Sequence, residues 1–231
     1  MSRFAIRSYE NELLDADDIP FADIQQNMQE LNTINTLLGG HGITIKGLKK
    51  LAGRSASLSI CEIGCGGGDN LRVIHQFCTK NNIRVQLTGI DIKDSCIAFA
   101  QEKNTDLPAT WICSDYRKAV FPSGQPDIIF SSLFCHHFIE EDLVTMMQWM
   151  NSNSIQGFFI NDLHRHPLAY YSIKGITQLF SKSYLVKNDA PLSVARGFRK
   201  KEWQVIFSKA NLSPVDISWQ WAFRHLIVYK K

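Results

Sequence analysis

Long hydrophobic runs are missing from this chain of 231 residues. No run approaches the roughly 18 apolar residues that a membrane-spanning helix needs. The N-terminal stretch MSRFAIRSYENELLDADD turns acidic before the apolar core of a signal peptide can form. These two absences predict a cytoplasmic protein that has no membrane partner.

The chain also has little excess charge and few residues that break regular structure. Its 25 basic and 22 acidic residues leave a net charge of +3, so nothing here demands a nucleic-acid partner. Glycine and proline number 14 + 7 = 21, too few for a fibrous or low-complexity chain, and 45% of the residues are hydrophobic. A folded protein of one large or two small domains is expected.

Cysteine is present, but the paired CxxC motifs of a structural zinc site are absent. The six cysteines are at positions 61, 65, 78, 96, 113 and 135. A structural zinc site is therefore not expected. In a reducing compartment these residues should remain free thiols.

Two patterns of periodicity divide the chain. Apolar residues recur at three- and four-residue steps between Pro20 and Gly39-Gly40, which predicts a helix. With a short second helix expected over 44–52, residues 1–55 are interpreted as an N-terminal helical cap. Residues 56–231 form the second predicted domain. Its strands are expected over 57–64, 84–92, 109–115, 127–133 and 157–163, and its helices over 69–80, over 94–103 and from about 140. This alternation predicts an α/β fold with a mostly parallel sheet covered on both faces.

The alternation stops after the fifth predicted strand. Residues from 167 to about 198 are interpreted as a helical insertion that forms a lid over an acceptor. A helix is expected over 200–210, followed by strands over 212–219 and 222–230. The short connection between these last two strands predicts an antiparallel hairpin.

The sharpest motif is Glu62-Ile63-Gly64-Cys65-Gly66-Gly67-Gly68-Asp69, which lies between a predicted strand and a predicted helix. Glycines here let the backbone turn tightly and approach a ligand. A P-loop is excluded because no Lys-Ser or Lys-Thr follows. A dinucleotide-binding loop would have glycine where this chain has Asp69. The acid at Glu62 suits a cationic amino-acid group better than a pyrophosphate.

This [DE]xGxGxG run resembles motif I of the class I S-adenosylmethionine-dependent methyltransferases. The resemblance covers about residues 57–163 and implies S-adenosylmethionine as cofactor and S-adenosylhomocysteine as product. It also implies a Rossmann-like, doubly wound sheet of order 3-2-1-4-5-7-6 with strand 7 antiparallel. The loop residues assigned to the cofactor are Glu62, Gly64, Cys65, Gly66, Gly68 and Asp69.

Polar residues at the next strand ends fit the same cofactor. Asp91 follows Gly68 by 91 − 68 = 23 residues, near the offset of a ribose-binding acid. Ile92 is expected against the adenine, and Asp115 is expected to accept a hydrogen bond from its amino group. The strand-end residues assigned to the cofactor are Asp91, Ile92, Asp115, Tyr116, Ser131 and Ser132. The alternative for each acid is a turn-capping role.

Histidines follow the fourth and fifth predicted strands, in the segments SSLFCHHF (131–138) and NDLHRHP (161–167). Histidine suits proton removal from a hydroxyl acceptor near neutral pH. His136, His137 and His164 are therefore candidates for a general base, with His137 first. The alternatives are structural hydrogen bonding and metal ligation. No metal is expected, because adjacent histidines should point their side chains apart.

The segment SSLFCHHF is similar to small-molecule methyltransferases of the ubiquinone and menaquinone biosynthesis type. The segments SYExELLD, LNTINTLLGG and NDLHRHPLAYY resemble bacterial enzymes associated with polyketide or aryl-polyene pathways. These resemblances imply O-methylation of a phenolic or polyketide-like aromatic acceptor by a monomer or homodimer. The residues expected to contact the acceptor are Phe134, Tyr170, Tyr171 and Arg196. An RNA methyltransferase and a catalytically silent adenosyl-ligand-binding protein stay open as alternatives, and an NAD-dependent dehydrogenase is a weaker third.

Overall fold

A computed structural model describes residues 4–16, 18–121 and 124–231 of the chain. The helices are α1 (Phe21–Leu37), α2 (Gly40–Ala52), α3 (Asp69–Lys80), α4 (Asp94–Lys103), α5 (Glu140–Asn153), α6 (Pro167–Phe180), α7 (Tyr184–Arg196) and α8 (Lys200–Lys209), with short 3-10 turns η1 (Leu13–Asp15), η2 (Tyr116–Lys118) and η3 (Cys135–His137). The strands are β1 (Ser57–Ile63), β2 (Arg84–Asp91), β3 (Ala109–Cys113), β4 (Ile128–Ser132), β5 (Gly157–Leu163), β6 (Asp216–Gln220) and β7 (Arg224–Lys230).

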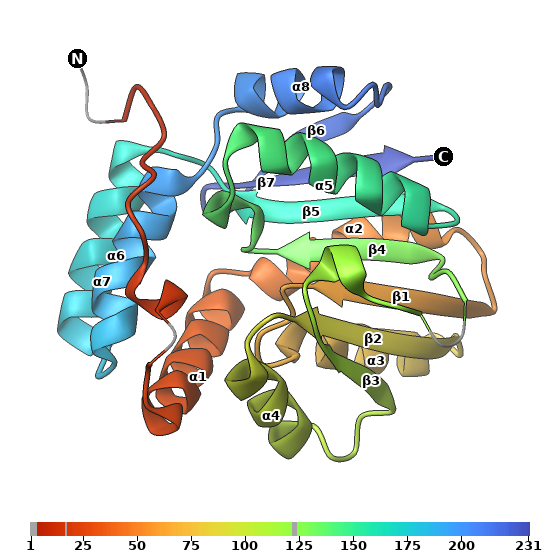
Figure 1. The fold of residues 1–231 in the computed structure, drawn as a ribbon, viewed down its shortest axis with the longest axis horizontal. Coiled ribbons are helices and arrows are strands. Elements are labelled where there is room, and N and C mark those ends of the chain that lie inside the picture. Colours follow the sequence, from red (N-terminus) through yellow and green to blue (C-terminus); the bar gives the residue numbers. More distant parts are fainter. Residues whose placement is uncertain (1–3, 17, 122–123) are drawn as a thin grey trace.

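The seven strands form one sheet in the order β3-β2-β1-β4-β5-β7-β6. Strands β1 to β5 pair in parallel, and β7 runs antiparallel between β5 and β6. The predicted α/β fold, strand order and antiparallel strand 7 are confirmed. The parallel strands end at one edge of the sheet, where α1, α6 and α7 gather (Figure 1).

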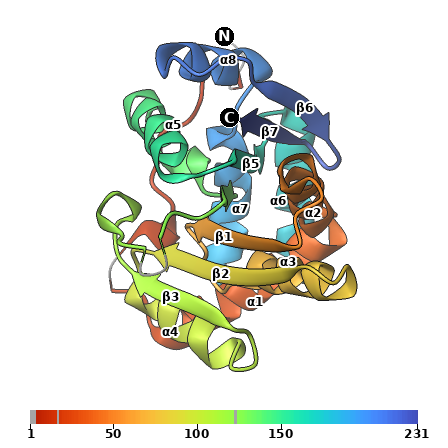
Figure 2. The same ribbon diagram turned by 90° about the vertical axis from the view of Figure 1, so that its right-hand side faces the viewer.

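Buried apolar residues alternate between the two faces of the sheet, as strand geometry requires. On one face Leu58 and Ile60 pack with residues of α2 and α3, such as Leu48 and Leu71. On the other face, residues of β1, β4 and β5 pack with α5 and α8, where Trp203 is fully buried. Figure 2 shows α2 and α5 on opposite sides of the sheet. The division of the chain at residue 55 stays a prediction, although α2 shares a core with β1.

Several element bounds differ from the predicted ones. Helix α2 begins at Gly40 rather than near residue 44, because Gly39 takes a left-handed conformation (φ 74°) that ends one helix and starts the next. The insertion after β5 folds as two helices, α6 and α7, which Ser181 and Ser183 separate. Strand β6 begins at Asp216 rather than at residue 212, because Pro214 has no backbone N–H to donate to a strand partner.

Residues 4–16, which we call the N-terminal strap, cross the carboxyl ends of the parallel strands. The Arg7 Nε donates to the Arg196 carbonyl at 2.9 Å, and the Ser8 backbone N–H donates to the Ala195 carbonyl at 3.1 Å. The strap therefore lies along α7 and closes this edge of the molecule (Figure 1). Among the described residues, no helix is both long and apolar enough to cross a membrane.

Candidate active site

The glycine loop between β1 and α3 has three left-handed residues. Gly64, Gly66 and Gly68 have φ values of 67°, 49° and 76°. A Cβ atom on Gly64 would lie 2.2 Å from the Phe134 ring, and one on Gly68 would lie 2.3 Å from the Trp111 ring. A Cβ on Gly66 would meet only the Met28 sulfur, at 3.3 Å. Packing therefore requires glycine at 64 and 68, whereas the surroundings of Gly66 leave more room.

Asp91 at the end of β2 holds this loop in place. Its Oδ2 accepts a hydrogen bond from the Gly66 backbone N–H at 2.9 Å, and its Oδ1 accepts one from the Lys93 N–H at 3.0 Å. Burial raises the pKa of Asp91, although these two backbone donors act in the opposite direction. Each carboxylate oxygen retains a second lone pair, so Asp91 can still accept from a ligand hydroxyl.

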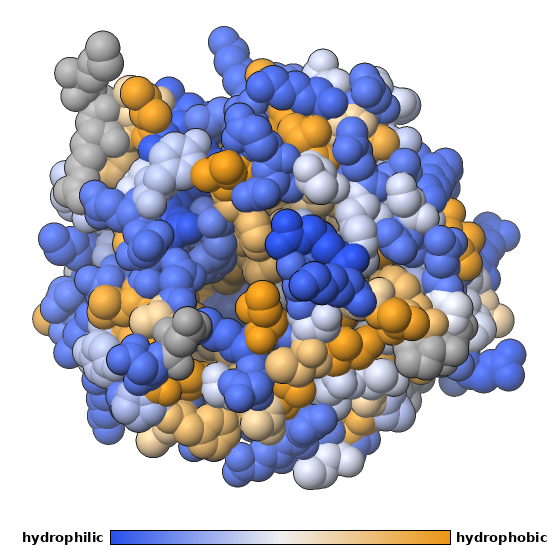
Figure 3. All heavy atoms as spheres, in the orientation of Figure 1, coloured by the Kyte–Doolittle hydropathy of each residue, from blue (hydrophilic) through white to orange (hydrophobic). Residues whose placement is uncertain are grey.

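A cavity of about 180 Å³ opens beside this loop. Its lining residues are Gly64, Ile90, Asp91, Ile92, Ser114, Asp115, Tyr116, Arg117, Phe134 and Phe138. Ile92 is 67% exposed, which is unusual for a large apolar side chain and suits a flat ring laid against it. In Figure 3 the surface is hollowed near the middle of the face shown, where the parallel strands end in Figure 1. Four lining residues were not among the predicted site residues: Ile90, Ser114, Arg117 and Phe138.

Asp115 lines the cavity, but its carboxylate is already engaged. Its Oδ2 pairs with the Arg117 Nη2 at 2.6 Å, and its Oδ1 accepts from the Arg117 backbone N–H at 3.0 Å. The Arg117 guanidinium lowers the pKa of Asp115 below its ordinary value. An adenine amino group would therefore compete with Arg117 for this carboxylate.

Other residues assigned to the cofactor are absent from the cavity wall. The Ser131 hydroxyl lies 3.4 Å from the Cys135 sulfur, and the Ser132 hydroxyl accepts from the Asn161 side chain at 3.2 Å. Both serines are buried. Cys65 is buried as well, and Asp69 begins α3, where burial raises its pKa to about 6. Ser131, Ser132 and Cys65 thus contact neighbouring protein groups rather than the described cavity.

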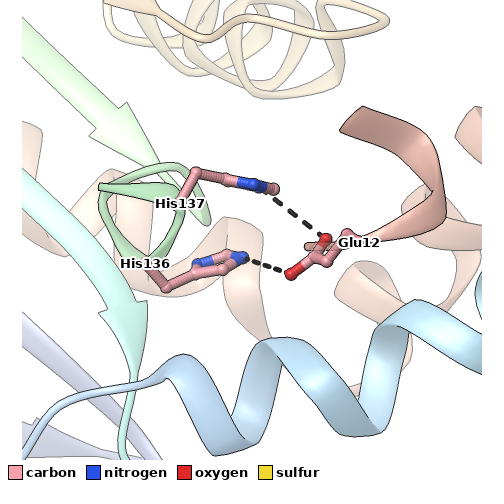
Figure 4. A group of neighbouring side chains, drawn as sticks. All are labelled: Glu12, His136 and His137. Atoms are coloured by element: carbon pink, nitrogen blue, oxygen red, sulfur yellow. Dashed lines mark ion pairs between the residues drawn. The ribbon is translucent and has the colours of Figure 1, made fainter. Parts of the chain in front are cut away.

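Two adjacent histidines of η3 face three carboxylates, one from β5 and two from the N-terminal strap. The His136 Nδ1 lies 2.9 Å from Asp162 of β5, and the His137 Nδ1 lies 3.2 Å from Asp15 of the strap. The Nε2 atoms face the Glu12 carboxylate, at 3.6 Å for His136 and 3.9 Å for His137 (Figure 4). We call these five residues the histidine cluster.

The expectation that the two rings would point apart is wrong. Their centroids are 4.5 Å apart with an interplanar angle of 32°, and both Nε2 atoms face the same Glu12 carboxylate. The third predicted base, His164, lies outside this group. Its Nδ1 is 3.1 Å from the Nε2 of His225 on β7.

The residues predicted to contact an acceptor fall into different places. Phe134 lines the cavity. Arg196 does not offer its guanidinium to a ligand, because it is buried and donates to the carbonyls of His136 at 3.1 Å and His137 at 2.9 Å. Tyr170 is buried against Phe4, and Tyr171 is exposed, so neither lines the cavity. Helix α6 of the insertion thus places its two tyrosines outside the lining of the described cavity, and the lid role of the insertion stays a prediction.

Comparison with known proteins matches residues 60–153 to the methyltransferase domain family. The malonyl-[acyl-carrier protein] O-methyltransferase of Anoxybacillus flavithermus is 36% identical over 61 residues, which are 26% of this chain and 22% of that protein. The enzyme of the same name from Bacillus cereus is 23% identical over 172 residues, 74% of this chain and 60% of that protein. The structure of the plantazolicin methyltransferase BpumL with S-adenosylhomocysteine superposes with a TM-score of 0.64 at 17% identity, covering 91% of this chain and 89% of that one.

Residues 60–153 of this chain match a methyltransferase domain, and the seven-stranded sheet has the strand order of the methyltransferase fold. The chain spans less than two thirds of the length of either curated relative. The matched residues of the methyltransferase domain contain the glycine loop, Asp91, Asp115 and the histidine pair. The likeness to the solved structure shows that the fold extends over nearly the whole chain.

The surroundings of Glu62 indicate whether the residues present fit S-adenosylmethionine. Its Oε1 accepts from the Asn70 side chain at 2.9 Å, while its buried Oε2 has no hydrogen-bond partner. Burial raises the pKa of this carboxyl well above its ordinary value. A buried carboxyl oxygen without a partner is costly, and a ligand ammonium group is a suitable partner for it. The residues present therefore fit a cofactor with a cationic amino-acid end and an adenosine end.

Proposed function

We propose that the protein transfers a methyl group from S-adenosylmethionine to a hydroxyl oxygen of a small phenolic or polyketide-like aromatic molecule. The observation that carries this proposal is one continuous edge of the sheet. There the unpartnered Glu62 oxygen, the Asp91 carboxylate and the exposed Ile92 stand in the order in which an amino acid, a ribose and an adenine would need them. The two curated relatives that are named O-methyltransferases support oxygen as the methylated atom.

Each group of residues has a distinct task in this proposal. Glu62 orients the amino group, Asp91 accepts from the ribose, and Ile92 lies against the adenine. When bound, S-adenosylmethionine supplies the methyl group from its sulfonium sulfur and leaves as S-adenosylhomocysteine. The protein aligns the acceptor oxygen with that methyl group and excludes water, because an in-line displacement depends on orientation. A new O–CH₃ bond forms, the S–CH₃ bond breaks, and the hydroxyl proton must leave the acceptor.

Proton removal is assigned to the histidine cluster rather than to one free histidine. Both nitrogens of His136 and of His137 face carboxylates, so neither ring has a nitrogen turned toward an open site. His137 is the more accessible of the two, at 23% exposure of its side chain. Its ring is 6.4 Å from that of Phe134, which lines the cavity. His137 therefore remains the first candidate through which the cluster acts on an acceptor.

Transfer of a tritium-labelled methyl group tests this proposal. The protein is incubated with labelled S-adenosylmethionine and, in parallel, with phenols, quinols, malonyl-acyl carrier protein and bulk tRNA. The expected result is label on phenolic oxygen and none on tRNA. Label on tRNA alone would overturn the small-molecule proposal, and label on nitrogen or carbon of a small acceptor would correct the methylated atom. Binding of S-adenosylmethionine without transfer to any acceptor would favour a silent binding protein.

A further inference from the structure

We propose that Glu12, His136 and His137 form a binding site for one divalent transition-metal ion, of which Zn²⁺ is the best probe. The ligand atoms are the Nε2 of each histidine and a Glu12 carboxylate oxygen, and all lie within 4.8 Å of one another. Figure 4 shows both rings turned toward this carboxylate. The binding of the ion is independent of the proposed methyl transfer.

The distances within the histidine cluster show that the Nδ1 atoms make hydrogen bonds to carboxylates, whereas the Nε2 atoms do not. Each Nδ1 is at hydrogen-bond distance from its carboxylate, 2.9 Å for His136 and 3.2 Å for His137. Each Nε2 is farther from Glu12, at 3.6 and 3.9 Å, which is too long for an N–H···O hydrogen bond. Two ligands about 2.1 Å from one zinc ion at a tetrahedral angle stand about 3.4 Å apart. The two contacts run to different oxygens of Glu12, and the three ligand atoms lie within 4.8 Å of one another, so these atoms have to draw together by up to about 1.4 Å to enclose an ion.

Carboxylates behind both histidines complete the arrangement. A metal-binding histidine characteristically donates its other ring N–H to a carboxylate, which fixes the tautomer and turns the free lone pair toward the metal. Asp162 does this for His136, and Asp15 does it for His137. With Nδ1 protonated, each Nε2 presents a lone pair to the lone pairs of Glu12. Such facing lone pairs repel one another unless a cation lies between them.

The charge balance of the cluster also favours a cation. Glu12 has a side chain only 4% exposed, and among the ion pairs of the described residues it meets histidines and no lysine or arginine. Arg196 pairs with Asp15 at 3.4 Å and acts on Glu12 only at longer range, while the Ser193 hydroxyl donates to the Glu12 Oε1 at 2.8 Å. Two imidazoles and one carboxylate suit zinc and its neighbours in the first transition row. Three protein ligands leave one position open.

An ion here would join the strap to the strand ends beside the cavity. Glu12 is separated from the histidines by more than 120 residues, and the ion would tie these two segments together. At its open position an acceptor hydroxyl could bind, and the ion would lower the pKa of that hydroxyl so that its proton passes to water. This second role rests on the proposed methyl transfer and would replace His137 as the base, because an Nε2 that binds the ion has no lone pair left for a proton. Ion binding itself does not depend on methyl transfer.

The test begins with chelator-treated protein that is titrated with Zn²⁺ by calorimetry and then with Co²⁺, whose visible absorption reports its ligands. We expect one ion per chain. His137→Gln should weaken Zn²⁺ binding by about 100-fold or more, and Asp162→Asn by about 10–100-fold, the range seen when a carboxylate behind a ligand is lost. His75→Gln on α3 is the matched control and should bind like the wild type.

Two outcomes would overturn the site. One is wild-type protein that binds no stoichiometric Zn²⁺, and the other is a His137→Gln variant that binds it with wild-type affinity. Unfolding of the metal-free variants is measured alongside to show that they are folded. His137 is chosen for substitution because its side chain is partly exposed, whereas that of His136 is buried. Normal S-adenosylmethionine binding by His137→Gln, with Zn²⁺ binding lost, would support the site whether or not any acceptor is methylated.

Discussion

At the scale of single residues, the three glycines of the loop differ in what surrounds them. Gly64 and Gly68 each face an aromatic ring, whereas Gly66 faces only the flexible Met28 side chain. Gly66→Ala should therefore cost about 1 kcal/mol of stability for its positive φ and still fold. It should also weaken S-adenosylmethionine binding, because the new methyl group enters the space proposed for the ligand. Calorimetry together with urea unfolding measures both effects.

Gly64→Ala is the matched comparison for that prediction. Its Cβ would overlap the Phe134 ring, so a larger loss of stability, of about 1–3 kcal/mol beyond the backbone cost, is expected from overpacking. If Gly66→Ala bound S-adenosylmethionine with unchanged affinity, the cofactor would not pass over Gly66.

Asp91 carries a second residue-scale prediction. Asp91→Asn keeps one oxygen for a backbone donor, whereas Asp91→Ala removes both loop contacts. We expect Asp91→Asn to weaken cofactor binding by about 1.5–3 kcal/mol, the scale of hydrogen bonds to a charged group. The KM for S-adenosylmethionine should rise more than kcat falls, since ribose contacts are alike in ground and transition states. An unchanged KM would place the ribose elsewhere.

His137 supplies a kinetic prediction. His137→Gln should lower kcat by about 10²–10⁴-fold, the usual contribution of proton transfer in catalysis, with S-adenosylmethionine affinity nearly unchanged. The loss should be smaller for acceptors with more acidic hydroxyls, because less help with deprotonation is then needed. Rates across phenols of graded pKa measure this trend. An equal loss for every phenol would indicate a positioning role for His137 instead.

At the scale of elements, His164 directly after β5 and His225 on β7 form a pair that responds to pH. Burial lowers the pKa of His225 to about 4, with nearby His164 acting in the same direction, and burial also lowers the pKa of His164. His225 is therefore neutral when folded but has its ordinary pKa of about 6.5 when unfolded. Its contribution to stability is complete above about pH 6.5 and is lost as the pH falls toward 4.

Urea unfolding at pH 7 and pH 5 measures this loss. The wild type should lose about 1–2 kcal/mol more than His225→Gln between these pH values. The His75→Gln variant should retain the wild-type difference. Equal pH dependence of His225→Gln and the wild type would show that the pair does not control acid stability.

Elements whose burial is visible as a local sequence pattern could be predicted, whereas segments held by long-range contacts could not. Strands β1, β4 and β5 are mostly buried, so their apolar runs marked them clearly in the sequence. The edge strand β3 is not buried, and the acid that follows it marked its end instead. The strap is different, because its role depends on contacts with partners more than 120 residues away, such as Arg7 with the carbonyl of Phe138. The local periodicity of a sequence does not predict such long-range contacts. The same limit applies to Arg196, whose basic charge suggested a ligand contact, whereas its donors are used by backbone carbonyls.

At the scale of the whole molecule, a buried polar chain connects the N-terminal helices to the glycine loop. Glu62 accepts from Asn70, and Asn70 in turn lies 2.9 Å from the Thr44 hydroxyl and 3.1 Å from the His41 ring. Thr44 and His41 belong to α2, and His41 also reaches Asn32 of α1 at 3.0 Å. A ligand that binds the Glu62 carboxyl should therefore stabilise α1 and α2 together with the sheet.

Ligand-dependent stability tests this connection and the cofactor together. A ligand that binds only the folded chain at 100 times its Kd raises the free energy of unfolding by about 2.7 kcal/mol. We expect S-adenosylmethionine and S-adenosylhomocysteine to produce this shift and NAD to produce none, because Asp69 replaces the glycine that a dinucleotide loop needs. Hydrogen exchange should show added protection in α1 and α2 as well as in the loop. Thr44→Val should reduce the added protection of α1 and α2 more than that of β2, whereas equal loss everywhere would mean that the polar chain does not couple these helices to the site.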